Sequence, residues 1–399
     1  MGRSRELRRR MVDILLRNGT VTSPEVKAAF LAVARETFVP QILAEAGLDR
    51  VYADDALVTR KLGGVPTSSS SQPSIMALML EALDLRPGHR VLEVGLGTGY
   101  NAALLRTLVG PTGAVTSIDI APDVVDEARA ALGTAGLTVE TIVGNGADGY
   151  PASAPYDRII VTASTDIVPS AWWEQLAPDG IVVVPLRFGG MQLVAVLART
   201  ATGFVATRVI QGGFMPMRPS AEAPSAGGVT ITIDTNLGDG RTSWVSISGT
   251  GLAALTSDAR AALVGNLLAA PRTIPVPGAY PIRALIWQGV MSTPSDRQIV
   301  VYEHDAGTRF GTVGPDGAVA AMRTGAHDAT AVLNAIELYG SADELGTQLL
   351  TIARNWYDAG GPDLDRLALA IDYDTGTPAP PWALATWRPD RQRWCLGWS

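Results

Sequence analysis

The stretch from Val91 to Asn101, VLEVGLGTGYN, constrains the fold of this chain more than any other segment. The residues up to Val94 are apolar apart from one acid and predict a buried strand, and the run NAALLRTLV from Asn101 predicts a helix. Gly95, Gly97 and Gly99 then lie in the turn between them. A strand, a glycine turn and a helix open a doubly wound α/β domain, which binds its ligand at the carboxyl end of the strands.

The spacing of these glycines points to a particular nucleotide. It is G-x-G-x-G, whereas dinucleotide-binding turns have G-x-G-x-x-G, and the acid Glu93 stands two residues before the first glycine. S-adenosylmethionine (SAM) has no pyrophosphate, but its amino-acid tail and ribose need a close backbone approach and carboxylate acceptors. The turn therefore predicts a SAM-dependent methyltransferase. The alternative is a tight strand-to-helix connection without a ligand.

Further strands at regular α/β intervals favour the SAM interpretation. Ala114–Ile120 predicts a second strand ending in Asp119, where units of this kind hold a ribose hydroxyl pair. Val139–Asn145 predicts a strand that brings Asn145 to the same edge, where an adenine would lie. The other strands that we expect in this sheet are Tyr156–Ser164, Gln175–Pro185 and a hairpin around Ala201–Gly203. The cofactor-binding residues predicted from these segments are Glu93, Gly95, Leu96, Gly97, Gly99, Asn101, Asp119, Ile120, Asn145 and Gly146.

Composition limits the class of protein and its partners. A chain of 399 residues that is 47% hydrophobic is long for a single domain, so we expect two. A net charge of −7 argues against a nucleic-acid partner, which would require a basic face. The arginines near the start lie on a predicted amphipathic helix, whose polar face is expected to be solvated. The single cysteine, Cys395, excludes an intramolecular disulfide and fits a reducing compartment. Without an apolar signal segment or membrane span, we expect a soluble, cytoplasmic protein.

The chain divides into two regions by its composition. Residues 1–217 hold two predicted N-terminal helices and the α/β sheet, and Arg218–Gly228 is rich in Pro, Ala, Ser and Gly and reads as a linker. Residues 229–399 contain strand runs and helices typical of an α+β domain, without a glycine-rich turn, a metal-ligand spacing or a repeat. This second domain is expected either to recognise a peptide substrate or to serve as a structural or dimerising module. The sequence favours no particular oligomeric state.

Methyl transfer from a sulfonium is an in-line displacement, so the enzyme mainly aligns donor and nucleophile. A carboxylate nucleophile is already ionised at neutral pH and needs no general base. The three histidines are poor candidates for a base, because His89 lies in a turn before the first strand and His304 and His327 fall in the second region. This pattern favours a carboxylate acceptor.

A run of serines precedes the sheet. Gly63–Pro73, GGVPTSSSSQP, leads into a predicted helix at Pro73 and could lie as a loop over the carboxyl ends of the strands. Hydroxyls and free N–H groups at a helix N-terminus suit a carboxylate. We therefore take Ser69, Ser70 and Ser71 as candidate catalytic residues. The alternative is a flexible linker.

Several segments, in this order, resemble the protein-L-isoaspartate O-methyltransferase family. They are FVP (Phe38–Pro40), YADDAL (Tyr52–Leu57), SQP (Ser71–Pro73), VLEVGLGTGYNAALL, GNGADGYPASAPYDRIIVTAS (Gly144–Ser164) and FMPM (Phe214–Met217). The resemblance implies a class I SAM-methyltransferase (Rossmann-like) fold and the free carboxylate of an isoaspartyl residue as the acceptor. It implies that Ser71 contacts that acceptor, that Ser71 and Gln72 lie beside the cofactor, and that Asn145 stands where the family usually has an Asp near adenine.

Two departures from the family pattern suggest a different substrate. The segment before SQP is normally a short G-x-T-I-S run but is all serine here, and family members that repair proteins generally end near the start of this linker. Both features resemble a subgroup that tailors ribosomally made, modified peptides such as lanthipeptides and ATP-grasp-ligated peptides. There the acceptor is an ordinary aspartate, and the methyl ester closes to an aspartimide that can hydrolyse to isoaspartate. The alternatives are repair of damaged proteins, or a SAM-binding interaction protein that no longer transfers methyl groups.

Overall fold

The computed structural model describes most of the chain. The described residues are 2–62, 65–188, 191–221, 230–236, 242–293, 295–303, 307–324, 332–373, 376 and 378–399. Of the predicted linker, residues 222–228 lie outside this set, as do His304 and His327.

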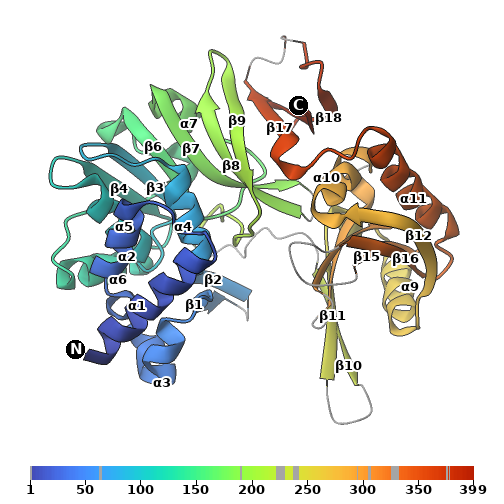
Figure 1. The fold of residues 1–399 in the computed structure, drawn as a ribbon, viewed down its shortest axis with the longest axis horizontal. Helices are drawn as coiled ribbons and strands as arrows, with labels where there is room; N and C mark the ends of the chain where they lie inside the picture. Colours follow the sequence, from blue (N-terminus) through green and yellow to red (C-terminus); the bar gives the residue numbers. More distant parts are fainter. Residues whose placement is uncertain are drawn as a thin grey trace.

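Ten strands within the described residues form one mixed sheet, in the order β18-β19-β17-β9-β8-β7-β6-β3-β4-β5 (Figure 1). Strand β3 (Arg90–Val94) pairs in parallel with β4 (Ala114–Asp119) on one side and with β6 (Tyr156–Val161) on the other. The order of the strands therefore reverses between β3 and β6, and ligands of such sheets bind at this point, beyond the carboxyl ends. The predicted doubly wound α/β fold is confirmed. The next strands of the sheet are β5 (Glu140–Val143), β7 (Leu176–Phe188), β8 (Met191–Arg199) and β9 (Gly203–Ile210).

Helices cover both faces of this sheet because its central strands are apolar on both sides. Val91 packs with the N-terminal helices, whereas Leu92 and Val94 face the opposite core with Trp172. This alternation is the period of two expected of a strand. The helical elements of this part are α1 (Gly2–Arg17), α2 (Pro24–Ala32), η1 (Arg35–Phe38), α3 (Pro40–Val51), α4 (Pro73–Ala82), α5 (Tyr100–Val109), α6 (Pro122–Thr134), η2 (Gly146–Asp148), η3 (Pro151–Ser153) and α7 (Ser170–Gln175).

The serine run is a strand in the structure, not the loop that we expected. β1 (Leu57–Leu62) and β2 (Val65–Ser70) form a separate antiparallel pair, with Leu57 opposite Ser70. Ser68 and Ser70 are buried, and Ser69 between them is half-buried. The serines have little intrinsic preference for a strand, so pairing with β1 and contacts of their backbone decide the conformation.

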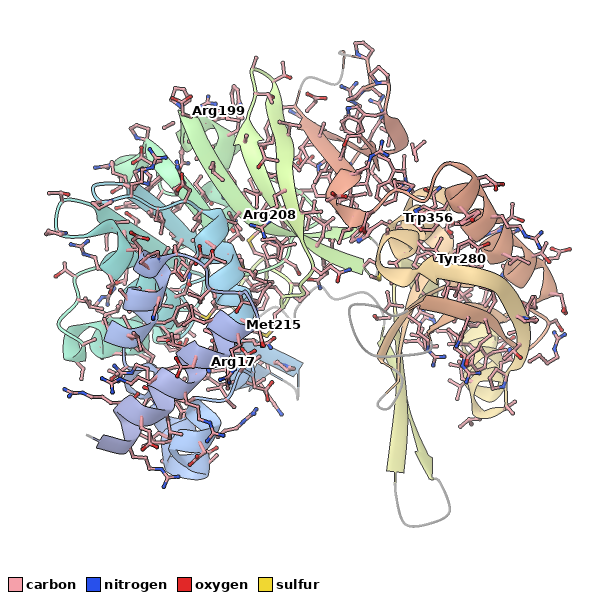
Figure 2. The ribbon with its side chains drawn as sticks, viewed as in Figure 1. Arg17, Arg199, Arg208, Met215, Tyr280 and Trp356 are labelled. Carbon is pink, nitrogen blue, oxygen red and sulfur yellow. The ribbon has the colours of Figure 1, made fainter. Side chains whose placement is uncertain are left out.

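A second sheet forms from the region after the linker. Among the described residues its strands are antiparallel, in the order β10-β11-β13-β14-β15-β16-β12. Helix α11 (Asp343–Asp358) buries an apolar stripe, and its Trp356 meets Tyr280 of β12 (Arg272–Pro281) with ring centroids 6.3 Å apart (Figure 2). The elements are β10 (Thr230–Asn236), β11 (Thr242–Ser248), α8 (Thr250–Ala253), α9 (Ser257–Leu268), β12 (Arg272–Pro281), α10 (Ile282–Ser292), η4 (Ser295–Arg297), β13 (Gln298–Glu303), β14 (Gly307–Val313), β15 (Val319–Thr324), β16 (Val332–Tyr339) and α11 (Asp343–Asp358). No helix within the described ranges combines the length and apolar character that crossing a membrane requires.

The end of the chain returns to the first sheet. After η5 (Leu364–Arg366), strand β17 (Leu367–Asp372) pairs antiparallel with β9, and β19 (Arg393–Trp398) and β18 (Ala383–Trp387) follow it (Figure 1). The last two strands, β18 and β19, form an antiparallel hairpin. We had placed residues 229–399 in one separate domain, but the structure distributes them over two sheets. The predicted hairpin, β8 and β9, is consequently not at the edge of the sheet, because β17 pairs with the outer side of β9.

The final hairpin also holds the loop that follows β6. The side-chain amide of Gln392 accepts from the Val168 N–H at 3.2 Å and donates to the Val168 carbonyl at 2.7 Å. Tyr373 Oη donates to the same carbonyl at 2.8 Å. Gln392 is only 5% exposed, so these bonds are shielded from water. The last strands thus brace a loop at the carboxyl edge of the sheet.

Aromatic rings join the two parts of the molecule. Phe188, at the end of β7, lies 5.6 Å from Trp287 of α10 and 5.4 and 5.5 Å from Trp387 and Trp394 of the last strands, as ring centroids. Trp398 Nε1 adds a hydrogen bond to Gln288 Oε1 of α10 at 2.8 Å. One apolar core therefore continues from the first sheet into the second region.

Removal of the Phe188 ring tests this junction. Phe188→Ala is expected to lower the free energy of unfolding by about 3–5 kcal/mol, because it leaves a cavity among three tryptophans. Urea unfolding measures the loss, with Val205→Ala as the control because Val205 is 37% exposed on β9. If Phe188→Ala loses no more stability than Val205→Ala, the cluster does not hold the two parts together.

Candidate active site

The glycine turn follows β3 as predicted. Gly95, Gly97 and Gly99 have φ angles of 97°, 51° and 85°, which residues with a side chain rarely adopt. A Cβ at Gly95 would lie 2.3 Å from Thr162 Oγ1, and one at Gly97 would lie 3.3 Å from the Ser69 carbonyl. The turn is therefore restricted to glycine by backbone conformation and, at Gly95, by space.

Glu93 lies beneath the turn and is fully buried. Its carboxylate accepts from Asn101 Nδ2 at 2.7 Å and from the Ser117 hydroxyl. Burial raises the pKa of Glu93 to about 7, although both hydrogen bonds lower it. Because Asn101 Nδ2 is bound to Glu93, its other amide atom, Oδ1, is left as an acceptor. Glu93 thus orients the side chain of Asn101.

Asp119 ends β4 beside the turn. Its carboxylate accepts from the Gly97 N–H at 3.0 Å and from the Ala121 N–H at 3.2 Å. Burial raises the pKa of Asp119, and these backbone hydrogen bonds oppose that shift. The carboxylate therefore supports the turn and also lies in the wall of the adjoining cavity.

A cavity of about 410 Å³ opens at this edge of the sheet. Of the predicted site residues, those that line it are Ser69, Ser70, Ser71, Gln72, Gly95, Leu96, Gly97, Asn101, Asp119, Ile120 and Gly146. Glu93, Gly99 and Asn145 do not line it. The structure thus brings the serine strand and the glycine turn, which are apart in sequence, to one cavity.

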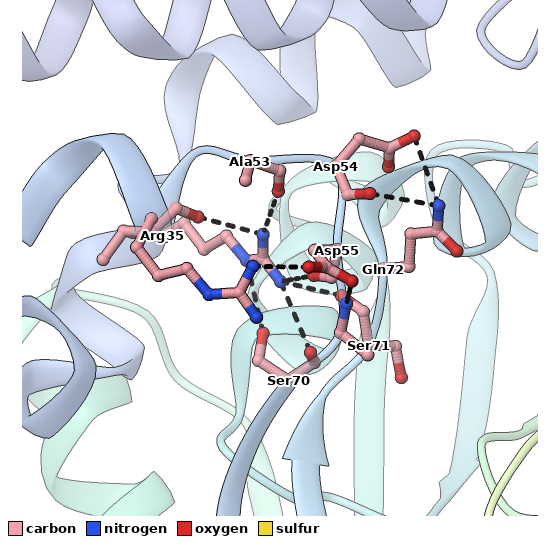
Figure 3. Close-up of polar contacts among 10 residues, drawn as sticks. Arg35, Ala53, Asp54, Asp55, Ser70, Ser71 and Gln72 are labelled. Atoms are coloured by element: carbon pink, nitrogen blue, oxygen red, sulfur yellow. Dashed lines mark hydrogen bonds and ion pairs between the residues drawn. The ribbon is translucent and has the colours of Figure 1, made fainter. Parts of the chain in front are cut away.

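Arg35 fixes the end of the serine strand (Figure 3). This arginine is fully buried, and its guanidinium donates to the carbonyls of Ser70 at 3.3 Å and Ser71 at 2.9 Å. Its Nε donates to Ser70 Oγ at 3.4 Å. Ser70 therefore presents its hydroxyl to Arg35, and Ser71, which is half-buried, is held through its backbone.

The start of α4 is occupied by a protein carboxylate. Asp54 Oδ1 accepts from the Ser74 N–H at 2.8 Å, and the Asp54 carbonyl accepts from Gln72 Nε2 at 3.1 Å. We expected free N–H groups at this helix N-terminus to suit an acceptor carboxylate. The Ser74 N–H already donates to Asp54, so the hydroxyl of Ser71 is the stronger candidate for contact with the methyl acceptor.

Asn145 lies next to the cavity wall but its side chain has a local partner. Its Oδ1 accepts from the Ala147 N–H at 3.1 Å and caps the short helix η2. Its predicted contact with adenine stays a prediction. Gly146, which follows it, lines the cavity.

Three contributors were missed from the sequence: Arg35, Thr162 and Arg218. Thr162 Oγ1 donates to the Gly95 carbonyl at 2.6 Å, and Arg218 lines the cavity. Arginine is rarely buried, so nothing in the run RETF marks Arg35 as internal. Arg218 fell in the segment that we interpreted as a linker, and only its position directly after FMPM could have pointed to it.

Comparison with known proteins agrees with this geometry. Residues 6–221 match the family described as protein-L-isoaspartate(D-aspartate) O-methyltransferase. The chain belongs to this family. A protein-L-isoaspartate O-methyltransferase of Methanopyrus kandleri is 41% identical over 216 residues, which are 53% of this chain and 92% of that protein. One of Ignicoccus hospitalis is 38% identical over 214 residues, covering 53% and 97%. A solved structure of the same name is 27% identical and covers 91% of this chain and 95% of its own, with a TM-score of 0.48.

Family membership confirms two predictions. The family consists of SAM-dependent protein carboxyl methyltransferases, so the predicted cofactor and reaction class hold. Its substrates are proteins that contain isoaspartate. The family match ends at residue 221, so it does not include the second sheet or strands β17–β19.

The residues of the cavity fit SAM. Asn101 Oδ1 is buried and, among the described residues, has no hydrogen-bond donor, so it can accept from the ammonium of an amino-acid tail. The Asp119 carboxylate at the cavity wall can accept from ribose hydroxyls. Bound SAM supplies an electrophilic methyl group on sulfur. These contacts of single residues with the cofactor stay predictions.

The buried carboxyl of Glu93 predicts a pH dependence of stability. Its pKa is 4.5 in an unfolded chain and about 7 when folded, so between these values the folded state holds a proton that the unfolded state has lost. The free energy of unfolding therefore falls as the pH rises through this window, by up to about 1.4 kcal/mol per pH unit. In Glu93→Gln the contribution of this carboxyl to the slope is expected to disappear.

Urea unfolding across the window measures the slope. The control is Glu6→Gln, because Glu6 is exposed on α1 and its replacement should leave the slope unchanged. If Glu93→Gln retains the slope of wild type, Glu93 does not titrate there.

Proposed function

We propose that this protein esterifies the side-chain carboxylate of an ordinary aspartate in a ribosomally made, modified precursor peptide, with SAM as the methyl donor. The observation that carries the proposal is the cavity itself, which joins the glycine turn to the serine strand without a histidine among its described lining residues. An acceptor that needs no base fits this lining. A carboxylate is such an acceptor, since it is ionised at neutral pH.

The reaction balances without a further reactant. One oxygen of the aspartate attacks the methyl carbon as the methyl–sulfur bond breaks, which yields the methyl ester and neutral S-adenosylhomocysteine (SAH). The backbone nitrogen of the next residue can then attack the ester carbonyl, losing its proton as methanol leaves. The product is an aspartimide, which water opens to aspartate or isoaspartate.

The residues of this chain would act by binding and orientation. Asn101 and Asp119 would hold the amino-acid tail and the ribose of the cofactor, and the Ser71 hydroxyl would donate to one oxygen of the acceptor while the other attacks. Because Arg35 fixes the Ser71 carbonyl, the backbone beside this hydroxyl has a set position. Such positioning can supply a large part of the rate.

The second region supports a dedicated peptide partner. It lies outside the matched family residues, yet its last strands pair with β9 and brace the loop after β6. A dedicated peptide partner would give this region a use in holding the substrate. The alternative is repair of isoaspartyl residues in proteins, and the names of the relatives favour it.

Mass spectrometry with two acceptors tests the proposal. The protein is incubated with SAM and either an unstructured isoaspartyl peptide or a cyclised precursor that carries normal aspartate. We expect the cyclised aspartate to gain one CH2 group, or to lose one water once the aspartimide closes. Methylation of the isoaspartyl peptide alone would refute the tailoring function and support repair.

Separate replacement of Ser71 and Ser70 distinguishes contact with the acceptor from support of the buried Arg35. Ser71→Ala is expected to lower turnover about tenfold or more, because one hydrogen bond to a charged acceptor is lost, and to leave SAH affinity unchanged. Ser70→Ala removes an acceptor of buried Arg35 and is expected to lower the free energy of unfolding by about 1–3 kcal/mol. Kinetics, calorimetric titration with SAH and urea unfolding measure the three quantities. Equal turnover in Ser71→Ala and wild type would show that the acceptor does not contact this hydroxyl.

A further inference from the structure

Arg218 lies in the wall of the cavity at the end of the segment that follows β9. Backbone bonds fix this segment to the loop after β6, since the Ser164 N–H donates to the Met215 carbonyl and the Met217 N–H donates to the Ser164 carbonyl, both at 2.8 Å. Arg218 directly follows the second of these bonds. Its backbone position is therefore set through the loop after β6, and it lines the same cavity as the glycine turn.

The guanidinium of Arg218 is only partly used by the protein. It is half-buried, and its Nη1 donates to the Ala221 carbonyl. Among the described residues this backbone carbonyl is its hydrogen-bond acceptor and no carboxylate pairs with it, although an arginine offers five N–H donors. A half-buried cation with free donors at a cavity wall suits an anionic ligand.

The charged residues that line the cavity also favour an anionic ligand. Of its described lining residues Arg218 alone is basic, and Asp119 alone carries a carboxylate. The oxygens of Asp119 accept from the Gly97 and Ala121 N–H groups, and the charge of Arg218 lowers the Asp119 pKa from a distance without a hydrogen bond between them. Since no carboxylate of the described residues pairs with Arg218, a ligand can supply the anion.

We propose that Arg218 is the residue that recognises a ligand carboxylate in this cavity. The carboxylate is either that of the amino-acid tail of SAM or the acceptor side chain of the peptide, and the second source rests on the proposed function. A guanidinium matches a carboxylate with two parallel, charge-assisted hydrogen bonds, which are stronger than those of a serine hydroxyl. Each oxygen of a carboxylate held in this way keeps a further lone pair, so one oxygen can still attack the methyl carbon.

The test compares Arg218→Gln with Arg208→Gln. Arg208 is exposed on β9 and does not line the cavity, so its replacement removes an equal charge elsewhere; Figure 2 labels it in the strand, away from Met215. Calorimetry gives the affinity for SAH and for 5′-methylthioadenosine, which lacks the amino-acid tail. Turnover of the isoaspartyl peptide and of the cyclised precursor gives kcat and KM.

The outcomes separate the two sources. If Arg218 binds the tail, Arg218→Gln loses affinity for SAH about tenfold or more and keeps its affinity for 5′-methylthioadenosine. If Arg218 binds the acceptor, the affinity for SAH is unchanged and the KM of the peptide rises about tenfold or more. In either case Arg218→Lys should restore part of the loss.

Two further results are decisive. Affinities and kinetics equal to those of Arg208→Gln would overturn the assignment of Arg218. A wild-type protein that binds SAH but methylates neither peptide would refute the proposed function without deciding on Arg218. The acceptor source then falls with the proposed function, and the comparison of SAH with 5′-methylthioadenosine decides on the tail. An unchanged SAH affinity in Arg218→Gln would overturn the assignment, and a selective loss of SAH affinity would support it.

Discussion

The buried guanidinium of Arg35 holds together the part of the molecule on which the site depends. It donates to the carbonyls of Val51, Ala53 and Asp55, at 2.9, 3.1 and 3.1 Å, and to the two serine carbonyls at the end of β2. Carbonyl dipoles thus compensate the charge in place of a carboxylate. Without the guanidinium, these buried carbonyls would lack partners, at a free-energy penalty of about 1–3 kcal/mol each.

This arrangement links the N-terminal helices to the chemistry at the sheet. The turn after α3 and the end of β2 share one cation, so the Ser71 backbone cannot move independently of the helices. The ring of Tyr100, at the start of α5, lies 5.8 Å from the same guanidinium. One cluster around Arg35 therefore positions both the glycine turn and the serine strand. Among the described residues no hydrogen bond joins the turn directly to the strand.

Local sequence patterns predicted much of this site, but they did not predict which distant segments pair with one another. The strand, glycine turn and helix around Gly97 were predictable because each depends on residues close in sequence. The serine strand was not, since its conformation comes from β1 and Arg35 and not from serine itself. The pairing of β17 with β9 was also missed, because a strand pattern does not identify its partner across a whole intervening sheet. Arg218 was placed in a linker on composition, which carries no information about a cavity.

The return of the last strands to β9 has a consequence for the synthesis of the chain. A ribosome completes β9 long before β17, with all of the second sheet made in between. Until β17 emerges, the outer edge of β9 presents unpaired N–H and C=O groups, which can pair with a neighbouring nascent chain. The pairing also joins residues far apart in sequence, and such contacts form slowly. Folding of this chain during synthesis should therefore depend on chaperones more than folding of the cofactor-binding part alone.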